Sequence, residues 1–269
     1  MVRECVEACL RLNYPEDGYE ILVIDDGSTP PVPAFGLSKV RVIRQEPGGP
    51  ATARNRGVQV ARGQWIAFTD DDCRPCGDWL LRLTHALDAS PHGLIGGYTR
   101  NALPLNPFSA ASQFLVDYLY LYFENRPRQQ FFTSNNMAAS RDRLLQINGF
   151  DESFPLPAAE DRDLCDRWVE SNGTLEYQPT AVVDHLHSMS LVGFLRQQYR
   201  YGRGARVLSQ RRALRGLTFQ PEPRTFYFGL FAAPFRSNPP GKALQLFFLL
   251  LLSQVANVAG FAMESSSGK

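Results

Sequence analysis

Three consecutive acidic residues, Asp70, Asp71 and Asp72, directly follow an apolar segment at residues 65–69. Carboxylates this close raise one another's pKa, so the cluster is stabilised when a cation lies among them. Oxygen ligands of this kind suit Mg²⁺ or Mn²⁺. Such an ion can bind the phosphates of a nucleoside diphosphate and stabilise the charge on a leaving group. The cluster therefore predicts a divalent-cation site, with a solvated acidic turn as the alternative.

A second acidic pair, Asp25 and Asp26, follows the apolar run 20–24 and precedes Gly27. Acidic side chains at the end of a strand accept hydrogen bonds from ribose hydroxyls in other nucleotide-binding folds. The alternative is an Asx turn that shapes the following loop.

The apolar runs that precede these acids belong to an alternating pattern. Strands are predicted at 20–24, 40–43, 65–69 and 181–183, and helices at 6–12, 51–61, 78–89, 107–124, 163–171 and 191–208, the last interrupted at Gly202 and Gly204. This order predicts an α/β fold with a mostly parallel sheet flanked by helices. Ligands of such sheets bind beyond the carboxyl ends of the strands, so both acidic clusters are expected at one site.

Several motifs in order resemble glycosyltransferase family 2. They are 23–28 (VIDDGS), 49–57 (GPATARNRG) with 65–72, 134–138 (SNNMA), 149–152 (GFDE) and 160–164 (EDRDL). The resemblance covers roughly residues 3–205. It implies a GT-A fold, which is Rossmann-like. It also implies inverting transfer of a sugar from a nucleotide-diphosphate sugar, with a UDP-sugar favoured, to a hydroxyl acceptor such as a glycan, a lipid-linked glycan or a small molecule.

The resemblance also implies roles for individual residues. Asp161 is expected to be the catalytic base, and the divalent metal (Mn²⁺ or Mg²⁺) is expected at Asp70, Asp72 and His185. The nucleotide and substrate contacts are expected from Asp25, Asp26, Arg54, Asp71, Asn136, Glu160 and Arg200.

The chemistry of inverting transfer agrees with a carboxylate base. The base takes the proton of the acceptor hydroxyl as its oxygen attacks the anomeric carbon. In an oxocarbenium-like transition state that hydroxyl becomes acidic, so a carboxylate suffices. Capping of the helix that follows is the structural alternative for Glu160 and Asp161.

Gln197, Arg200 and Tyr201 loosely resemble the QxxRW motif of processive synthases, although Tyr201 replaces the tryptophan.

The C-terminal part has an uneven charge pattern. No Asp or Glu occurs from residue 185 to 221, and residues 243–263 carry no charge. This uncharged stretch reaches the roughly 20 residues that span a bilayer as a helix, and an interfacial helix is the alternative.

We expect a catalytic domain over 1–205, with a nucleotide half near 1–100 and an acceptor half near 101–205. A membrane-associating extension over 206–269 would place the protein on the cytoplasmic face of the cell membrane, although a solvated basic helix would explain the arginines equally well.

Composition excludes some classes of function. Charged residues make up 20% and the net charge is +1, which favours a globular protein and gives no indication of nucleic-acid binding. The five cysteines fit a reducing compartment. Cys73 and Cys76 have zinc-ligand spacing, which Cys5 and Cys9 could complete, but packing of small apolar side chains is the simpler interpretation.

The start of the chain and the alternative classes of protein are also open to prediction from the sequence. Relatives in the resembled family begin with an apolar strand that this chain lacks before Arg3, so we expect a truncated start. A non-catalytic sugar-nucleotide or carbohydrate-binding relative is the main alternative. A nucleotidyltransferase would need a Gly-rich, Lys-containing phosphate loop, and a Rossmann dehydrogenase a GxGxxG after a strand; neither motif is visible.

Overall fold

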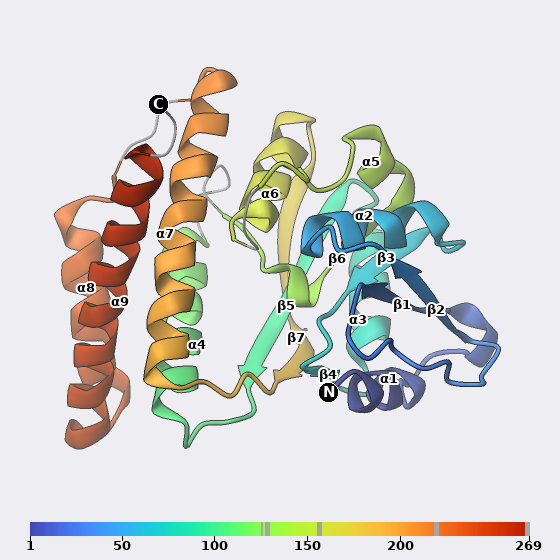
Figure 1. Cartoon of the computed structure of the whole chain (residues 1–269), viewed down its shortest axis with the longest axis horizontal. Coiled ribbons are helices and arrows are strands. Elements are labelled where there is room, and N and C mark those ends of the chain that lie inside the picture. Colours follow the sequence, from blue (N-terminus) through green and yellow to red (C-terminus); the bar gives the residue numbers. More distant parts are fainter. Residues whose placement is uncertain (125, 127–129, 155–157, 218–220, 267–269) are drawn as a thin grey trace. The chain divides into compact units, whose positions relative to one another are not determined.

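The computed structural model describes residues 1–124, 126, 130–154, 158–217 and 221–266 (Figure 1). The chain forms two compact units. The first comprises residues 1–100 and 126–186, and the second comprises residues 101–125 and 187–269. The described strands lie in the first unit, except that the last residue of β5, Asn101, begins the second unit, whose regular structure is otherwise helical. The predicted boundary at residue 205, between a catalytic domain and a C-terminal extension, is a different division of the chain and stays a prediction.

The first unit contains two sheets. Strands β1 (Ile21–Asp26) and β2 (Val40–Gln45) pair in parallel. A five-stranded sheet has the order β3-β6-β5-β7-β4. Its strands are β3 (Trp65–Phe68), β4 (Cys73–Pro75), β5 (Gly93–Asn101), β6 (Met137–Ser140) and β7 (Thr174–His185).

The predicted α/β class is confirmed, but the strands are mixed in direction rather than mostly parallel. Strand β6 is antiparallel to both β3 and β5, and β4 is antiparallel to β7. Strands β4 and β6 were not predicted because three or four residues give little periodicity, and β5, which has nine residues, was not predicted either. Among the described strands, β1 pairs with β2 alone and β3 ends the larger sheet, while the expected additional strand stays a prediction.

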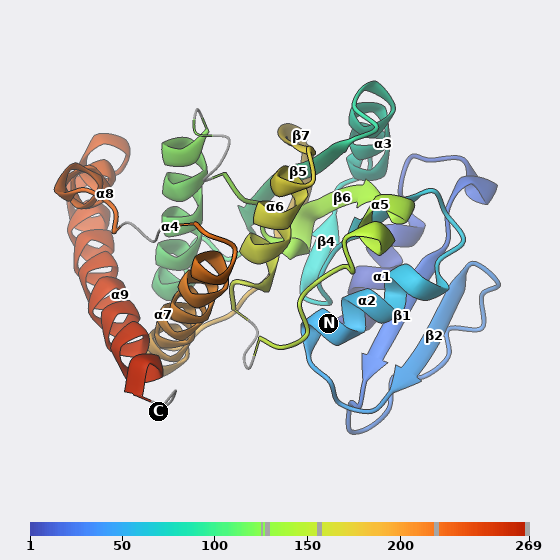
Figure 2. The ribbon, with the colours of Figure 1, turned by 90° about the horizontal axis from the view of Figure 1, so that it is seen from above.

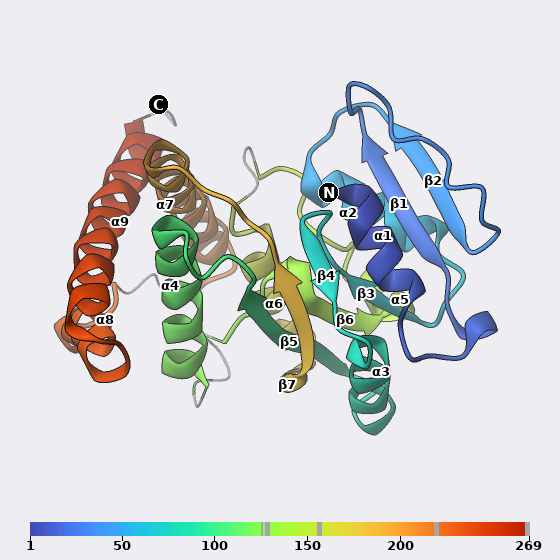
Figure 3. The same ribbon diagram turned by 90° about the horizontal axis from the view of Figure 1, so that it is seen from below.

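Helices cover the sheets of the first unit (Figures 2 and 3). They are α1 (Val2–Leu10), α2 (Pro50–Val60), α3 (Trp79–Ala89), α5 (Arg141–Gln146) and α6 (Glu160–Glu170), with 3₁₀ turns η1 (Glu16–Gly18) and η2 (Ser134–Asn136). Helix α3 packs against β3, β6 and β7, helix α6 against β7, and helix α2 against β1.

The main core of the first unit lies under α1 and α3. Trp79, Leu83 and Leu87 recur every four residues and are at most 3% exposed, as expected for one buried helix face. Cys5, Cys9 and Cys73 belong to the same cluster, which confirms the packing interpretation of these cysteines. Among the described residues, the thiols form no group of three metal ligands.

The second unit consists of α4 (Pro107–Phe123), α7 (Leu191–Leu214), α8 (Arg224–Ser237) and α9 (Pro240–Ser266). Helix α7 is continuous through Gly202 and Gly204, contrary to the predicted interruption. A helical glycine costs only about 1 kcal/mol, which tertiary packing can offset. The predicted apolar C-terminal helix is present as α9, and residues 240–264 are long and apolar enough, by composition alone, to cross a membrane.

Gly97 in β5 tests the packing of the larger sheet. A Cβ at this position would lie 2.3 Å from the carbonyl oxygen of Ala181 and 2.3 Å from Asn136 Oδ1. We expect Gly97→Ala to lower the free energy of unfolding by about 1–3 kcal/mol, because the neighbouring strand must move. Thermal unfolding checks this, with Gly241→Ala as the control because nothing lies within 4 Å of its Cβ. A melting temperature that falls by less than about 2 °C in Gly97→Ala would contradict the packing.

Candidate active site

Asp25 anchors the loop after β1. The parallel register places Asp25 opposite Arg44, and Arg44 Nη1 lies 2.5 Å from Asp25 Oδ2. The backbone N–H groups of Ser28 and Val32 donate to the same carboxylate at 2.8 and 3.2 Å. Burial by itself would raise the pKa of Asp25, but these donors and the Arg44 guanidinium lower it to about 2. Asp25 is therefore ionised and shapes the loop.

Asp26 ties the end of β1 to the start of α2. It accepts hydrogen bonds from Gln45 Nε2 at 2.8 Å and from the backbone N–H groups of Gly48 and Gly49 at 2.8 and 2.7 Å. Gly49 precedes α2 with a φ of 88°, a left-handed conformation that glycine adopts without strain. Burial opposes ionisation of Asp26, yet these donors lower its pKa. The carboxylate thus lies at a helix N-terminus, where negative charge is favoured.

Arg54 on α2 joins the end of β3 to the start of α6. Its Nη2 lies 3.0 Å from Asp70 Oδ1, and its Nη1 lies 3.1 Å from Glu160 Oε1. The Arg54 side chain is only 14% exposed. Burial would lower the pKa of Arg54, but Asp70 and Glu160 raise it above its usual range. The guanidinium is therefore charged and holds both carboxylates.

Glu160 and Asp161 form the first turn of α6. The helix has no side-chain cap, and Ala159 before it adopts a φ of 73°. A non-glycine residue in this region is strained, and such strain is common where function fixes side-chain positions. In place of capping, Asp161 accepts a hydrogen bond from the backbone N–H of Arg162 at 2.8 Å.

Both carboxyl groups of this turn bind protons more tightly than usual. Burial and the neighbouring Asp161 raise the pKa of Glu160 to about 7, although Arg54 opposes the shift. Burial also raises the pKa of Asp161, against the opposing effects of Arg54 and of the N–H groups of Arg162 and Ser134. Glu160 Oε2 is buried and accepts no hydrogen bond from the described residues. A carboxylate with a raised pKa is a stronger general base.

Asp72 and His185 lie together because β4 and β7 are paired. The antiparallel register places Cys73 opposite His185, and His185 Nε2 lies 3.2 Å from Asp72 Oδ2. Partial burial and the charges of Asp72 and Asp70 raise the pKa of Asp71. Carboxylate oxygens with one imidazole nitrogen are a ligand set that fits Mn²⁺ or Mg²⁺. Asp72 and His185 therefore fit part of the expected metal site, whereas Asp70 pairs with Arg54 and is outside the group of described ligand atoms that lie within 4.8 Å of one another.

Two predicted site residues lie in other surroundings. Asn136 is fully buried, accepts a hydrogen bond from Trp79 Nε1 at 2.8 Å, and donates to the carbonyl oxygens of Tyr98 and Ala181 at 3.0 Å. Arg200 lies on α7, in the second unit. The substrate-binding roles of Asn136 and Arg200 stay predictions.

Residues that were not predicted as site residues also hold the site together. Asn55 Oδ1 accepts from the N–H of Phe150 at 2.8 Å, and Asn55 Nδ2 donates to Glu152 Oε1 at 2.7 Å. This pair joins two of the motifs, which the sequence shows only as separate strings. Arg44 was also missed, although an arginine at the end of the next strand could have indicated a partner for Asp25.

Comparison with known proteins identifies the family. The model of the glycosyl transferase family 2 matches residues 1–147, more than half of the chain. The chain belongs to this family. The pre-mycofactocin glycosyltransferase of Mycobacterium tuberculosis is 28% identical over 221 residues, which cover 78% of this chain and 46% of that protein. Glycosyltransferase AglE of Haloferax volcanii is 25% identical over 214 residues, covering 76% of this chain and 68% of AglE. The chain thus spans about half the length of the M. tuberculosis protein.

Solved structures show the fold of this family 2 member. The mannosyltransferase PcManGT from Pyrobaculum calidifontis, in complex with GDP-Man and Mn²⁺, superposes with a TM-score of 0.66 at 16% identity, covering 100% of this chain and 84% of that chain. GalNAc-T7 with UDP, GalNAc and Mn²⁺ superposes with a TM-score of 0.54 at 14% identity, covering 99% and 53%. The expected GT-A fold is confirmed.

The raised pKa of Glu160 predicts a pH-dependent stability. A carboxyl whose pKa rises from 4.5 to about 7 on folding contributes stability that is complete below pH 4.5 and is lost as the pH rises through 7. We expect the melting temperature to fall less between pH 5 and pH 8 in Glu160→Gln than in the wild type. The exposed surface variant Glu46→Gln is the control and should keep the wild-type slope. An unchanged slope in Glu160→Gln would contradict the assignment.

Proposed function

We propose that this family 2 protein is an inverting glycosyltransferase that moves a sugar from a nucleoside-diphosphate sugar to a hydroxyl acceptor. One observation carries the proposal. Arg54 joins Asp70, at the expected phosphate and metal end, to the turn that holds Asp161. A donor phosphate and a general base are thereby expected on opposite sides of one buried guanidinium.

For the donor, we propose a UDP-sugar or another nucleoside-diphosphate sugar. Asp26 and the Asp25-anchored loop would contact the ribose and base. Asp71 would contact the donor beside the metal. The solved neighbours support the donor class, since PcManGT is in complex with GDP-Man and GalNAc-T7 with UDP.

For the cofactor, we propose that Asp70, Asp72 and His185 hold Mn²⁺ or Mg²⁺. When bound, the ion would bind the diphosphate and stabilise the negative charge of the leaving group. Asp70 is paired with Arg54, so the arginine would set the position of that ligand. Both solved neighbours carry Mn²⁺, which supports the choice of metal.

Proton transfer would be the task of Asp161. Its raised pKa allows it to take the proton of the acceptor hydroxyl as the oxygen attacks the anomeric carbon. Arg54 and the N–H groups of Arg162 and Ser134 would orient the carboxylate. Glu160 would hold Arg54, and Asn136 would hold β5, β7 and α3 together beneath the site.

For location, we propose the cytoplasmic face of the cell membrane, with a hydroxyl acceptor such as a lipid-linked glycan. The apolar helix α9 and the acid-free stretch before it support this placement. Arg200, in that basic stretch, would contact the anionic part of such an acceptor.

Replacing the base tests the mechanism. We expect Asp161→Asn to retain UDP binding and to slow sugar transfer by at least about a hundredfold, because the acceptor proton has no carboxylate to receive it. Turnover with a panel of sugar nucleotides and binding of UDP measure the two effects separately. Asp88→Asn, at an exposed position of α3, is the matched control. Near-normal turnover of Asp161→Asn would exclude Asp161 as the base.

Removing a metal ligand tests the cofactor. We expect Asp72→Ala to weaken Mn²⁺-dependent UDP binding by about tenfold or more, as for loss of a ligand or its support, with little change in the melting temperature. The control is Asp142→Ala, at an exposed position of α5. If EDTA leaves both donor binding and transfer of the wild type unchanged, the metal role is wrong.

A further inference from the structure

The C-terminal third of the chain is strongly basic. Residues 185–263 contain ten Lys and Arg residues and a single acidic residue, Glu222. The whole chain has 28 Lys and Arg against 27 Asp and Glu, so the remainder is net negative. A local excess of this size needs solvent or an anionic partner.

Helix α9 has one buried stripe and one exposed apolar stripe. Ala243, Leu246, Leu250 and Ser253 are at most 3% exposed and form the buried stripe. Seven apolar side chains on the other side are each at least 42% exposed: Leu244, Phe248, Leu251, Leu252, Val255, Val258 and Met263. Only 28% of the apolar window is buried, whereas the core helix of a soluble protein would be mostly buried. The outer stripe is thus apolar where a water-facing helix would be polar.

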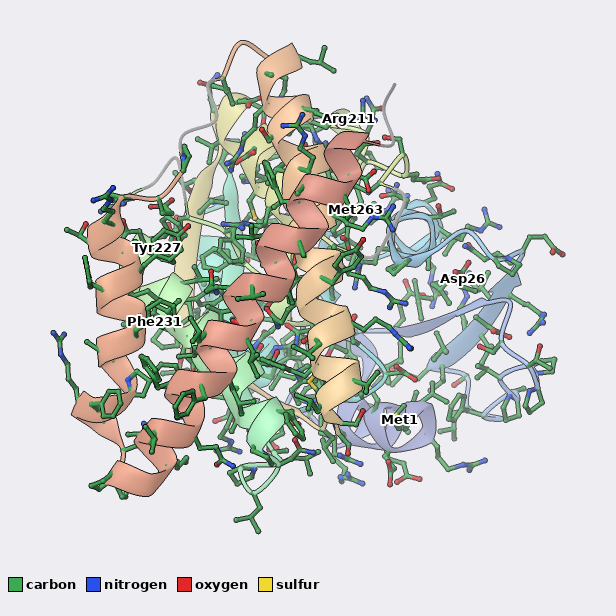
Figure 4. The ribbon with its side chains drawn as sticks, turned by 60° about the vertical axis from the view of Figure 1, so that its left-hand side comes forward. Met1, Asp26, Arg211, Tyr227, Phe231 and Met263 are labelled. Carbon is green, nitrogen blue, oxygen red and sulfur yellow. The ribbon has the colours of Figure 1, made fainter. Side chains whose placement is uncertain are left out.

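Helix α8 extends this surface. Tyr227, Phe228 and Phe235 are exposed on α8. The Phe247 ring of α9 lies 5.9 Å from that of Phe235 and 5.4 Å from that of Phe248, so the exposed residues of the two helices meet. We call these ten side chains the α8–α9 apolar face, and Figure 4 shows Tyr227 on α8 and Met263 near the end of α9. A patch this long exceeds the scattered apolar residues of ordinary surfaces.

Basic residues stand at the ends of the two helices. Arg224 begins α8, Arg236 lies in its last turn, and Lys242 lies in the first turn of α9. All three are exposed. Aromatic and aliphatic side chains flanked by cations are the pattern of helices that lie in the interface of an anionic bilayer.

The packing of α9 on α7 decides how it could meet a membrane. A Cβ on Gly202 would lie 1.9 Å from the Asn257 carbonyl oxygen, and one on Gly260 would lie 2.0 Å from the Tyr199 carbonyl oxygen. Glycine at both positions lets the two backbones touch. Arg203 Nε lies 2.6 Å from Glu264 Oε2, and the Arg206 guanidinium lies over the Phe261 ring. To cross a bilayer, helix α9 would have to separate from α7 or carry the arginines of α7 into the hydrocarbon. Both changes are costly.

We propose that the α8–α9 apolar face lies flat on an anionic lipid bilayer, with α9 in the plane of the membrane rather than across it. This refines the membrane attachment of the proposed function and rests on it. The apolar side chains enter the acyl boundary, and Arg224, Arg236 and Lys242 contact anionic headgroups. The buried stripe stays packed on α4 and α7.

Vesicle flotation of the purified full chain tests the partner. We expect the wild type to float with sealed vesicles that contain phosphatidylglycerol and to bind weakly to pure phosphatidylcholine. Replacing Phe248, Leu252 and Val255 by Ser should reduce partitioning at least about tenfold, since each removes apolar area from the lipid. Replacing Arg224, Arg236 and Lys242 by Gln should remove the preference for anionic vesicles. The matched control is Leu37→Ser with Leu105→Ser, which are exposed leucines outside the face.

Several results would overturn the proposal. One is a wild type that fails to float with the anionic vesicles. Another is a triple Ser variant that floats as well as the wild type and keeps the wild-type melting temperature. A wild type that stays in solution as a dimer, and becomes monomeric in the triple Ser variant, would assign the face to a second copy of the chain.

The orientation of α9 is tested with a membrane-impermeant maleimide. Single cysteines are placed at Lys242→Cys and after Lys269, in a Cys76→Ser background. Protein added to the outside of sealed vesicles should react at both ends without detergent. Protection of either end until detergent is added would show a span and exclude a flat helix. UDP binding is measured on every variant, so that failure of the donor-binding proposal is seen separately from failure of membrane binding.

Discussion

The candidate site depends on one buried guanidinium. Arg54 is held between Asp70 and Glu160, with Asp161 close enough to influence its pKa. Removing one partner of a buried ion pair typically costs about 3–5 kcal/mol because the other charge is left without compensation. Helix α2 and the end of β3, which are neighbours in the chain, are therefore locked to the distant start of α6 through a single side chain.

The strands supply the rest of the site through their register. Parallel pairing brings Asp25 against Arg44, and antiparallel pairing of β4 with β7 brings His185 beside Asp72. A slip of one residue would turn each of these side chains to the other face. The glycine-led N-terminus of α2 completes the arrangement by donating two backbone N–H groups to Asp26. Loop geometry, charge and register thus depend on one another in the first unit.

The second unit is held together by packing between helices. Its helices bury small and aromatic residues between them, as at Gly202 and at Phe226, and leave long apolar side chains outside on α8 and α9. Separating α9 from α7 would break backbone-to-backbone packing and the Arg203–Glu264 pair. The exposed apolar side chains therefore belong to a rigid bundle rather than to an isolated anchor.

Sequence alone determined the class of fold, the strands that lead into the two acidic clusters and the motifs that carry the chemistry. Apolar runs that end in Asp25-Asp26 and Asp70-Asp71-Asp72 are local signals, and local signals can be read without a structure. Glu160 and Asp161 were singled out by the resemblance of the motif at 160–164 to glycosyltransferase family 2. Tertiary structure decided everything that depends on residues distant in the chain: the pairing of Arg54 with Glu160, the engagement of Asn136 with Trp79, and the antiparallel placement of β6. It also brought α9 against α7 at Gly202 and Gly260. From the sequence, Gly202 was expected to interrupt a helix and Gly260 was given no role. The physical reason is that hydrogen bonds, burial and pKa shifts depend on neighbours in space, which periodicity along one segment does not specify.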